Sequence, residues 1–281
     1  MHRSASDSAV VAVLRAICRR RAVVLCYHGI SPRSTASDPT FLRVSPERFR
    51  SQVQLMREAG FHFVTVRELA MRAEGRPPPP GLAALSFDDG WDDNHAVVLP
   101  LLRELGLTAT VYVATGLIGR PNPWLPSSTA ARMMTVSELR DLHEAGFELG
   151  AHTVSHPDLE QLDRAECLRE MVDSRETIER ETGARVDTFA YPYCHYGAPA
   201  KGAAQAAGFI CAVTCAGRGG WDRFELKRAL ITGKDGWPSF LLKVTDAYEP
   251  LFQSLPGRLG RVSTRRARAA LRSALEARTR R

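Results

Sequence analysis

Short apolar runs alternate along this chain with segments of helical period. The clearest helix signal is at 46–59, where Phe49, Val53 and Met56 recur at the i, i+4, i+7 spacing of one helix face and a glycine follows. Apolar runs of strand length predict strands at 22–27, 61–66, 82–87, 108–113, 147–151, 187–191, 209–214 and 226–231. Helical spacing predicts further helices at 95–105, 135–145, 157–182 and 198–207.

The first turns of two predicted helices carry start signals. Thr135 and Glu138 have the spacing of a capping box, and Pro157 stands in the first turn predicted for 157–182. Strands that alternate with helices over this length favour a parallel sheet closed into an α/β barrel. Functional residues are then expected at the carboxyl ends of the strands. The segment 119–132 reads as a loop long enough to border such a site.

Composition and length narrow the class of protein. A chain of 281 residues with 44% hydrophobic residues suits one large barrel, and it contains no apolar run of about 18 residues that would span a bilayer. The arginines near the start follow a short apolar stretch, which reverses the order of a secretory signal, so a cytoplasmic location is expected. The six cysteines include no CxxC pair, which favours free thiols.

Adjacent carboxylates mark the end of the strand predicted at 82–87. The sequence SFDDG places Asp88 and Asp89 where a buried strand meets a glycine. One such carboxylate can bind a metal while the other accepts a proton. An Asp-Asp-Gly turn without chemistry explains the same residues, and this segment alone does not decide between the two.

Two histidines follow the strand predicted at 147–151. His152 and His156 stand four residues apart in HTVSH, and Pro157 disfavours helical backbone at His156, so a turn rather than a helix would bring them together. Capping or surface histidines are the alternative. With one aspartate they make a three-ligand site that leaves zinc a position for water, as in catalytic zinc sites.

A third segment, DTFAYPYCHYG at 187–197, ends another predicted strand in a Tyr-Pro turn. Such a turn can present a backbone N–H to an oxyanion, and its rings can flank a sugar. Packing alone would also explain the aromatic residues. Trp91 and Trp124 are further candidates for the border of a sugar cleft.

SFDDG, HTVSH and FAYPY resemble the first three motifs of the polysaccharide deacetylase family, also called NodB-homology carbohydrate esterases. VVLCYHGIS at 23–31 and the stretch 207–228 resemble that family's first and late strands. The resemblance implies an irregular barrel of about seven strands and hydrolysis of N-acetyl groups on an N-acetylated saccharide. By position it implies Asp89, His152 and His156 as ligands of a divalent metal, most simply Zn²⁺. It implies Asp88 as the base and Tyr193 as the donor of a backbone N–H to the oxyanion.

Two positions depart from the family's pattern. An arginine that steadies the base often precedes the third motif's proline by two residues, but Ala190 stands there. The family's late motif commonly holds, after a Leu, a His that acts as general acid, but Leu226 is followed by Lys227 and Arg228. The acid is therefore unassigned, with His28 the first candidate, His195 the second and protonated Asp88 an alternative.

Two other functions remain open at this stage. The departures are compatible with a non-catalytic sugar-binding or regulatory domain on the same fold, although such a domain has no need for a complete metal triad and base. A deacylase of a non-sugar amide would use the same residues.

The resemblance covers about 22–245, which predicts an N-terminal extension at 1–21 and a basic tail at 246–281. Residues 258–281 hold nine arginines and one glutamate, so they account for the net charge of +7. Alanines and a leucine at helical spacing in 265–275 allow peripheral contact with an anionic membrane, though a solvated tail is favoured. Nucleic acid is not expected as a partner, because no aromatic residues stand among the arginines.

Overall fold

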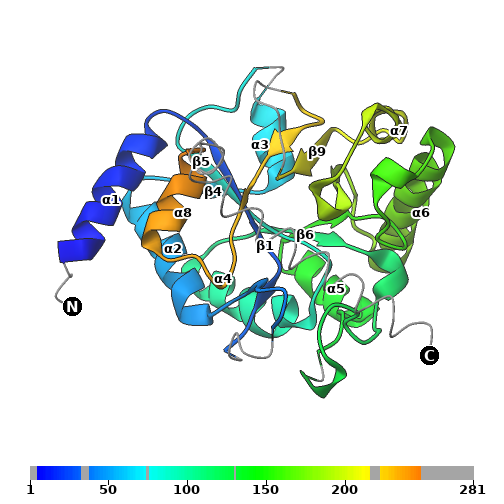
Figure 1. Ribbon diagram of the computed structural model, residues 1–281, viewed down its shortest axis with the longest axis horizontal. Coiled ribbons are helices and arrows are strands. Elements are labelled where there is room, and N and C mark those ends of the chain that lie inside the picture. The colour runs from blue at the N-terminus through cyan, green and yellow to red at the C-terminus, as the bar shows by residue number, and fades with distance from the viewer. Residues whose placement is uncertain (1–4, 33–37, 74–75, 130, 216–221, 248–281) are drawn as a thin grey trace, which may run out of the picture.

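Parallel strands form the centre of the molecule and helices surround them (Figure 1). The computed structural model describes residues 5–32, 38–73, 76–129, 131–215 and 222–247. The main sheet holds β1 (Val23–Tyr27), β4 (His62–Val64), β5 (Leu82–Phe87), β6 (Thr110–Val113), β7 (Glu148–Ala151), β8 (Thr188–Ala190), β9 (Cys211–Thr214), β10 (Leu226–Lys227) and β11 (Ala229–Leu230). Their order is β10-β9-β8-β7-β6-β5-β1-β11, with β4 also on β5. β2 (Gly29–Ile30) and β3 (Arg43–Val44) form a separate pair.

One short segment closes the barrel. β10 pairs with β9 through Leu226 and Val213, whereas β11 pairs with β1 through Ala229 and Leu25. The single strand predicted at 226–231 is therefore wrong in detail, because the backbone changes partner at Arg228. If β10 and β11 are counted together as one strand, they form a barrel of seven strands with β1 and β5 to β9. This confirms the predicted α/β barrel.

Helices cover the outside of the barrel. They are α1 (Ala5–Cys18), α2 (Pro46–Glu58), α3 (Val66–Arg72), α4 (Leu99–Leu105), α5 (Val136–Glu144), α6 (Arg164–Thr182), α7 (Ala198–Ala206) and α8 (Trp237–Val244), with a π-helical turn, η2 (Asn94–Val98), before α4. In Figure 1, α1, α2 and α8 lie together on one side and α6 and α7 on the opposite side. The capping box of Thr135 and Glu138 is present at the start of α5, as predicted.

The helix predicted at 157–182 begins seven residues later than expected. Asp163 caps α6 by accepting a hydrogen bond from the Glu166 N–H at 2.8 Å. Residues 157–163 instead contain the short 3-10 turn η5 (Leu159–Gln161), where the Asp158 side chain accepts from the Glu160 N–H at 3.1 Å. Proline at 157 thus follows a turn and does not open the helix.

Side chains inside the barrel form one cluster with those of α3, and a larger cluster lies beneath the other helices. The interior cluster includes Val24, Ala84, Tyr112 and Ala190, whereas the larger cluster packs the outer face of the sheet against the helices. A methyl group at Gly150 would lie 2.4 Å from Tyr112 Cε1, so the absence of a side chain there makes room for that ring. Small residues at these strand positions therefore admit large groups into the interior.

The N-terminal helix packs on the barrel. α1 buries Val10, Leu14 and Ile17 in the larger core and lies against α2 and α8 (Figure 1). The segment expected as an extension therefore contributes core side chains. The proposed domain boundaries remain predictions, and residues 248–281, with the predicted basic helix, lie outside the described residues. No helix in the described part of the chain is long and apolar enough to cross a membrane. All six cysteines are free thiols, as expected.

Candidate metal centre

Three predicted metal ligands meet at the carboxyl ends of β5 and β7. Asp89 Oδ1 lies 3.3 Å from His152 Nε2 and 3.2 Å from His156 Nε2, and the two Nε2 atoms lie 3.2 Å apart. All three residues are buried. The structure thus brings these three sequence-predicted residues to one point.

The triangle has the size that a tetrahedral metal requires. Bonds of about 2.0–2.1 Å to a central ion place neighbouring ligand atoms about 3.3–3.4 Å apart. His152 Nδ1 donates to the Ala190 carbonyl at 2.7 Å, which leaves the lone pair of Nε2 to bind a metal. The indole N–H of Trp91 donates to Asp89 Oδ2 at 3.0 Å, while Oδ1 has no aligned hydrogen-bond donor. The donor set therefore fits a divalent metal ion.

The contacts of the triad shift its pKa values in the metal-free protein. Burial alone would raise the pKa of Asp89, but the close contacts with His152 and His156 and the charge of His156 hold it well below its ordinary value. Burial would lower the pKa of His152, but the nearby Asp89 and Asp88 carboxylates raise it overall. A carboxylate kept ionised between two imidazoles suits the binding of a cation.

Unusual backbone conformations gather at this centre. Seven non-glycine residues in the described part of the chain have positive φ, and five lie in the three predicted segments 86–90, 152–156 and 187–197. They are Asp89 (73°), Thr153 (67°), His156 (57°), Tyr193 (56°) and Cys194 (58°). Left-handed conformations of such residues are costly and collect at functional sites. The clustering therefore favours function over the alternative of ordinary turns.

Polar contacts hold the loop that carries both histidines. Thr153 Oγ1 accepts from the His156 N–H at 3.0 Å. Glu170, on α6, accepts from the N–H groups of Val154 and Ser155 at 2.8 and 2.9 Å and from the Ser155 hydroxyl at 2.7 Å. No sequence pattern points to Glu170, because its partners are loop N–H groups that only the tertiary structure brings near.

Asp88 is buried beside the triad and is held by a guanidinium group. Arg228 Nη1 lies 2.6 Å from Asp88 Oδ1 and Nη2 lies 2.7 Å from Oδ2. The Cys26 thiol donates to Oδ2 at 3.4 Å. Burial raises the pKa of Asp88, but the positive charge of Arg228 and the neighbouring histidines lower it below its ordinary value. Asp88 is therefore a carboxylate at neutral pH.

The two histidines considered as proton donors differ in their surroundings. His28 follows β1, where the Tyr27 carbonyl accepts from the Asp88 N–H at 2.9 Å, and its Nδ1 is buried without a hydrogen-bond partner. Burial lowers the pKa of His28, which keeps the imidazole neutral at pH 7. His195 is half exposed, and its Nδ1 lies 3.1 Å from Asp158 Oδ2 at the rim.

Two aromatic rings border the metal ligands. The rings of Trp124 and Tyr193 meet the His156 ring edge to face, with centroids 4.8 and 4.6 Å away. Tyr193 is 54% exposed, so part of its ring is open to a ligand. Trp91, in contrast, is 1% exposed beneath the site, so the expectation that it borders a sugar cleft is wrong.

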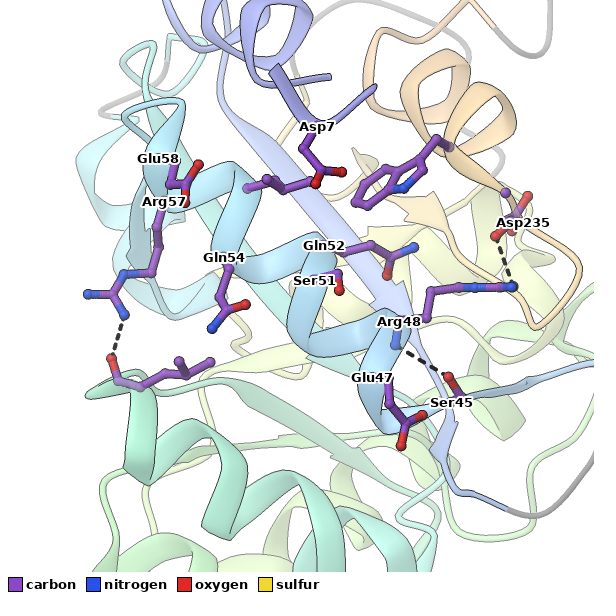
Figure 2. Close-up of a pocket in the computed structure, with 14 residues that line it drawn as sticks. Asp7, Ser45, Glu47, Arg48, Ser51, Gln52, Gln54, Arg57, Glu58 and Asp235 are labelled. Carbon is purple, nitrogen blue, oxygen red and sulfur yellow. Dashed lines mark hydrogen bonds between the residues drawn. The ribbon is translucent and has the colours of Figure 1, made fainter. Parts of the chain in front are cut away.

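A cavity lies away from the metal centre, between α1, α2 and α8 (Figure 2). It measures about 1150 Å³, and none of its lining residues belongs to the metal centre. Arg48 donates to the Asp235 carbonyl at 3.1 Å and Arg57 to the Leu105 carbonyl at 2.9 Å, so both guanidinium groups tie neighbouring elements together. This cavity is a groove between packed helices and contributes nothing to the triad.

A carboxylate and two histidines at the strand ends of a parallel barrel, with a second buried carboxylate beside them, are an arrangement that metal-dependent hydrolases use. The model of the polysaccharide deacetylase family matches residues 75–212. The chain belongs to the polysaccharide deacetylase family.

Individual relatives agree with this family. A Bacillus subtilis protein named as a polysaccharide deacetylase is 24% identical over 68% of this chain and 63% of its own length. The chitin deacetylase of Colletotrichum lindemuthianum is 28% identical over 44% of this chain and 46% of its own length. The chain thus spans less than two thirds of either relative. The structure of Streptococcus pyogenes deacetylase PplD in complex with acetate is 26% identical, with a TM-score of 0.67 over 80% of this chain and 98% of that one.

Proposed function

We propose that this protein is a metal-dependent hydrolase that removes N-acetyl groups from an N-acetylated saccharide. The observation that carries the proposal is the triangle of Asp89, His152 and His156 with an ionised Asp88 beside it. Its relatives are deacetylases by name, and one of them is a chitin deacetylase. A saccharide is therefore favoured over a non-sugar amide as the substrate.

Asp89, His152 and His156 would hold the metal, and we propose Zn²⁺ because two imidazoles and one carboxylate are typical of catalytic zinc. A divalent ion there lowers the pKa of a bound water and polarises an acetyl carbonyl. The Ala190 carbonyl and the Trp91 indole orient two of the ligands through their second polar atoms.

Asp88 is the proposed base. It is ionised at neutral pH and can accept a proton from the attacking water. We assign the stabilisation of the oxyanion to the backbone N–H of Tyr193. This residue has left-handed backbone conformation, and its ring contacts His156. The exposed ring of Tyr193 and the partly buried ring of Trp124 would then border the sugar.

The leaving amine must gain a proton before the sugar departs. Asp88, once protonated, can return its proton, and this route needs no further titrating group. His28 is the second candidate, but its lowered pKa leaves the ring neutral at pH 7 and makes it a poor donor. Retention of most activity in a His28→Gln variant would favour the return of the proton by Asp88.

The test compares Asp88→Asn with His152→Ala. Both purified variants and the wild type are loaded with zinc, and acetate release from N-acetylated chito-oligosaccharides is measured beside zinc content. We expect Asp88→Asn to bind zinc and lose turnover by about 10²–10⁴-fold, and His152→Ala to lose both zinc and turnover. A wild-type protein that binds zinc and the saccharide without releasing acetate would instead indicate a sugar-binding domain.

A further inference from the structure

The side chain of Arg228 enters the barrel from the segment that closes it. At this residue the backbone changes partner, from β9 through Lys227 to β1 through Ala229. The Arg228 N–H donates to the Thr214 carbonyl at 2.7 Å, which fixes the backbone on the β9 side. The side chain has 0% exposure.

The guanidinium is fitted to the two oxygens of one carboxylate. Nη1 and Nη2 lie 2.6 and 2.7 Å from the two oxygens of Asp88, and Nη1 also lies 3.1 Å from the Ser86 hydroxyl. The guanidinium carbon lies 5.5 Å from the centre of the Tyr112 ring. A planar group held on three sides defines the plane of the carboxylate that it binds, which an ammonium group cannot do.

Ala190 and Gly150 leave the interior space that this arrangement uses. Ala190 belongs to the same interior cluster as Tyr112, and Gly150 admits the Tyr112 ring on which the guanidinium lies. Small residues in the barrel interior therefore accompany the ring on which the guanidinium of Arg228 lies.

We infer that Arg228 is a positioning residue for the proposed hydrolysis, which holds the carboxylate of Asp88 in the orientation that accepts the proton of the attacking water. The inference rests on the proposed function. It also assigns the closing segment 226–230 a second role, because the strand pairs that complete the barrel bring the guanidinium to the base.

The test uses Arg228→Ala and Arg228→Lys, with Arg175→Ala as a matched control. Arg175 also lies over an aromatic ring, that of Phe209 at 5.6 Å, but its place is on α6. Zinc-loaded proteins are compared for kcat and KM on N-acetylated chito-oligosaccharides, for zinc content and for melting temperature. Arg228→Ala is also assayed with added guanidine hydrochloride at millimolar concentrations.

We expect Arg228→Ala to lose about 100-fold in kcat with KM and zinc content little changed, and added guanidinium to restore part of the loss. Arg228→Lys keeps the buried charge and should fold, yet recover only part of kcat. In an Asp88→Asn background, Arg228→Ala should cause no further loss. A folded Arg228→Lys protein with wild-type kcat would overturn the inference, as would a further loss in the double variant.

A structural readout separates this inference from the proposed function. In a crystal structure of Arg228→Lys, the Asp88 carboxylate should be rotated or present in several orientations. An Asp88 carboxylate in an unchanged single orientation would overturn the inference even if the wild type is an active deacetylase. If the wild type releases no acetate, the proposed function fails, and the orientation of Asp88 still decides whether Arg228 positions it.

Discussion

A single methyl group added at Gly150 should destabilise this protein because of its position opposite Tyr112. The two residues are direct partners in the pairing of β6 and β7. A Cβ at position 150 would lie 2.4 and 2.5 Å from two carbons of the Tyr112 ring and 3.0 Å from the Thr188 hydroxyl. Because carbon atoms in contact prefer separations of about 3.5–4.0 Å, the ring would have to move by about 1 Å.

The packing around the Tyr112 ring opposes that movement. Tyr112 is fully buried, and the guanidinium of Arg228 lies over its ring. Overpacking of this kind costs about 1–3 kcal/mol. For a domain of this size each kcal/mol lowers the melting temperature by about 2–4 °C. Gly150→Ala should therefore melt at least about 2 °C below the wild type.

The matched control is the same substitution at Gly202, within α7. A Cβ there meets only Arg164 Nε, at 3.5 Å, which is an ordinary contact. Alanine is favoured over glycine inside a helix, so Gly202→Ala should stabilise the protein by about 0.5–1 kcal/mol. Urea denaturation of both variants gives the two free energies of unfolding. The reasoning is refuted if Gly150→Ala is as stable as the wild type.

Three further outcomes follow from other contacts. Glu138→Gln should lower the free energy of unfolding by about 1 kcal/mol at pH 7. Because Arg132 lowers the folded-state pKa of Glu138 from 4.5 to about 2, the difference from wild type in urea denaturation should shrink as the pH falls from 4.5 to 2. A difference that stays constant over this range would contradict the expectation. Leu14→Ala should cost about 3 kcal/mol in the same assay, while the exposed Val13→Ala changes little, and equal effects would show that α1 does not pack as described. Glu170→Gln should weaken zinc binding about 10–100-fold in calorimetry, and Glu176→Gln, at an exposed position, serves as control. Unchanged zinc binding would show that the 152–156 loop keeps its conformation without Glu170.

Much of the barrel could be predicted because its strands are short apolar runs that end in Gly, Pro or polar residues. β5 and β7 are buried along nearly all of their length, and a candidate ligand follows within two residues of the end of each strand. The helix α6 was placed too early because periodicity continues through 157–163, whereas Asp163 and its capping box set the actual start. Caps of this kind decide helix ends when periodicity does not.

The α1 and α8 helices were not predicted. α1 stands before the first strand, where apolar residues among arginines have no strand to define their partner, yet Leu14 is fully buried. α8 begins at Trp237 after the last strand, in a segment with few turns of periodicity. Tertiary contacts of α1 with α2 and α8, and of α8 with β11, are absent from any local pattern and stabilise both helices.

Local sequence patterns do not reveal the role of Arg228, because its partner Asp88 stands 140 residues earlier. Ala190 lacks the expected arginine, and an arginine stands inside the apolar strand segment 226–231. A charged residue in such a segment is seldom buried unless it is paired. An unpaired buried base and an unexplained buried arginine would together have suggested the contact that the structure shows at 2.6 Å.

The central claim is that Asp89, His152 and His156 bind the metal through the atoms that face one another here. The most direct measurement is a crystal structure of the zinc-loaded protein with diffraction data collected on both sides of the zinc absorption edge. The account predicts one strong anomalous peak about 2.0–2.2 Å from Asp89 Oδ1 and the Nε2 atoms of both histidines. A peak at another cluster, or no peak at this triangle in protein that contains zinc, would contradict it.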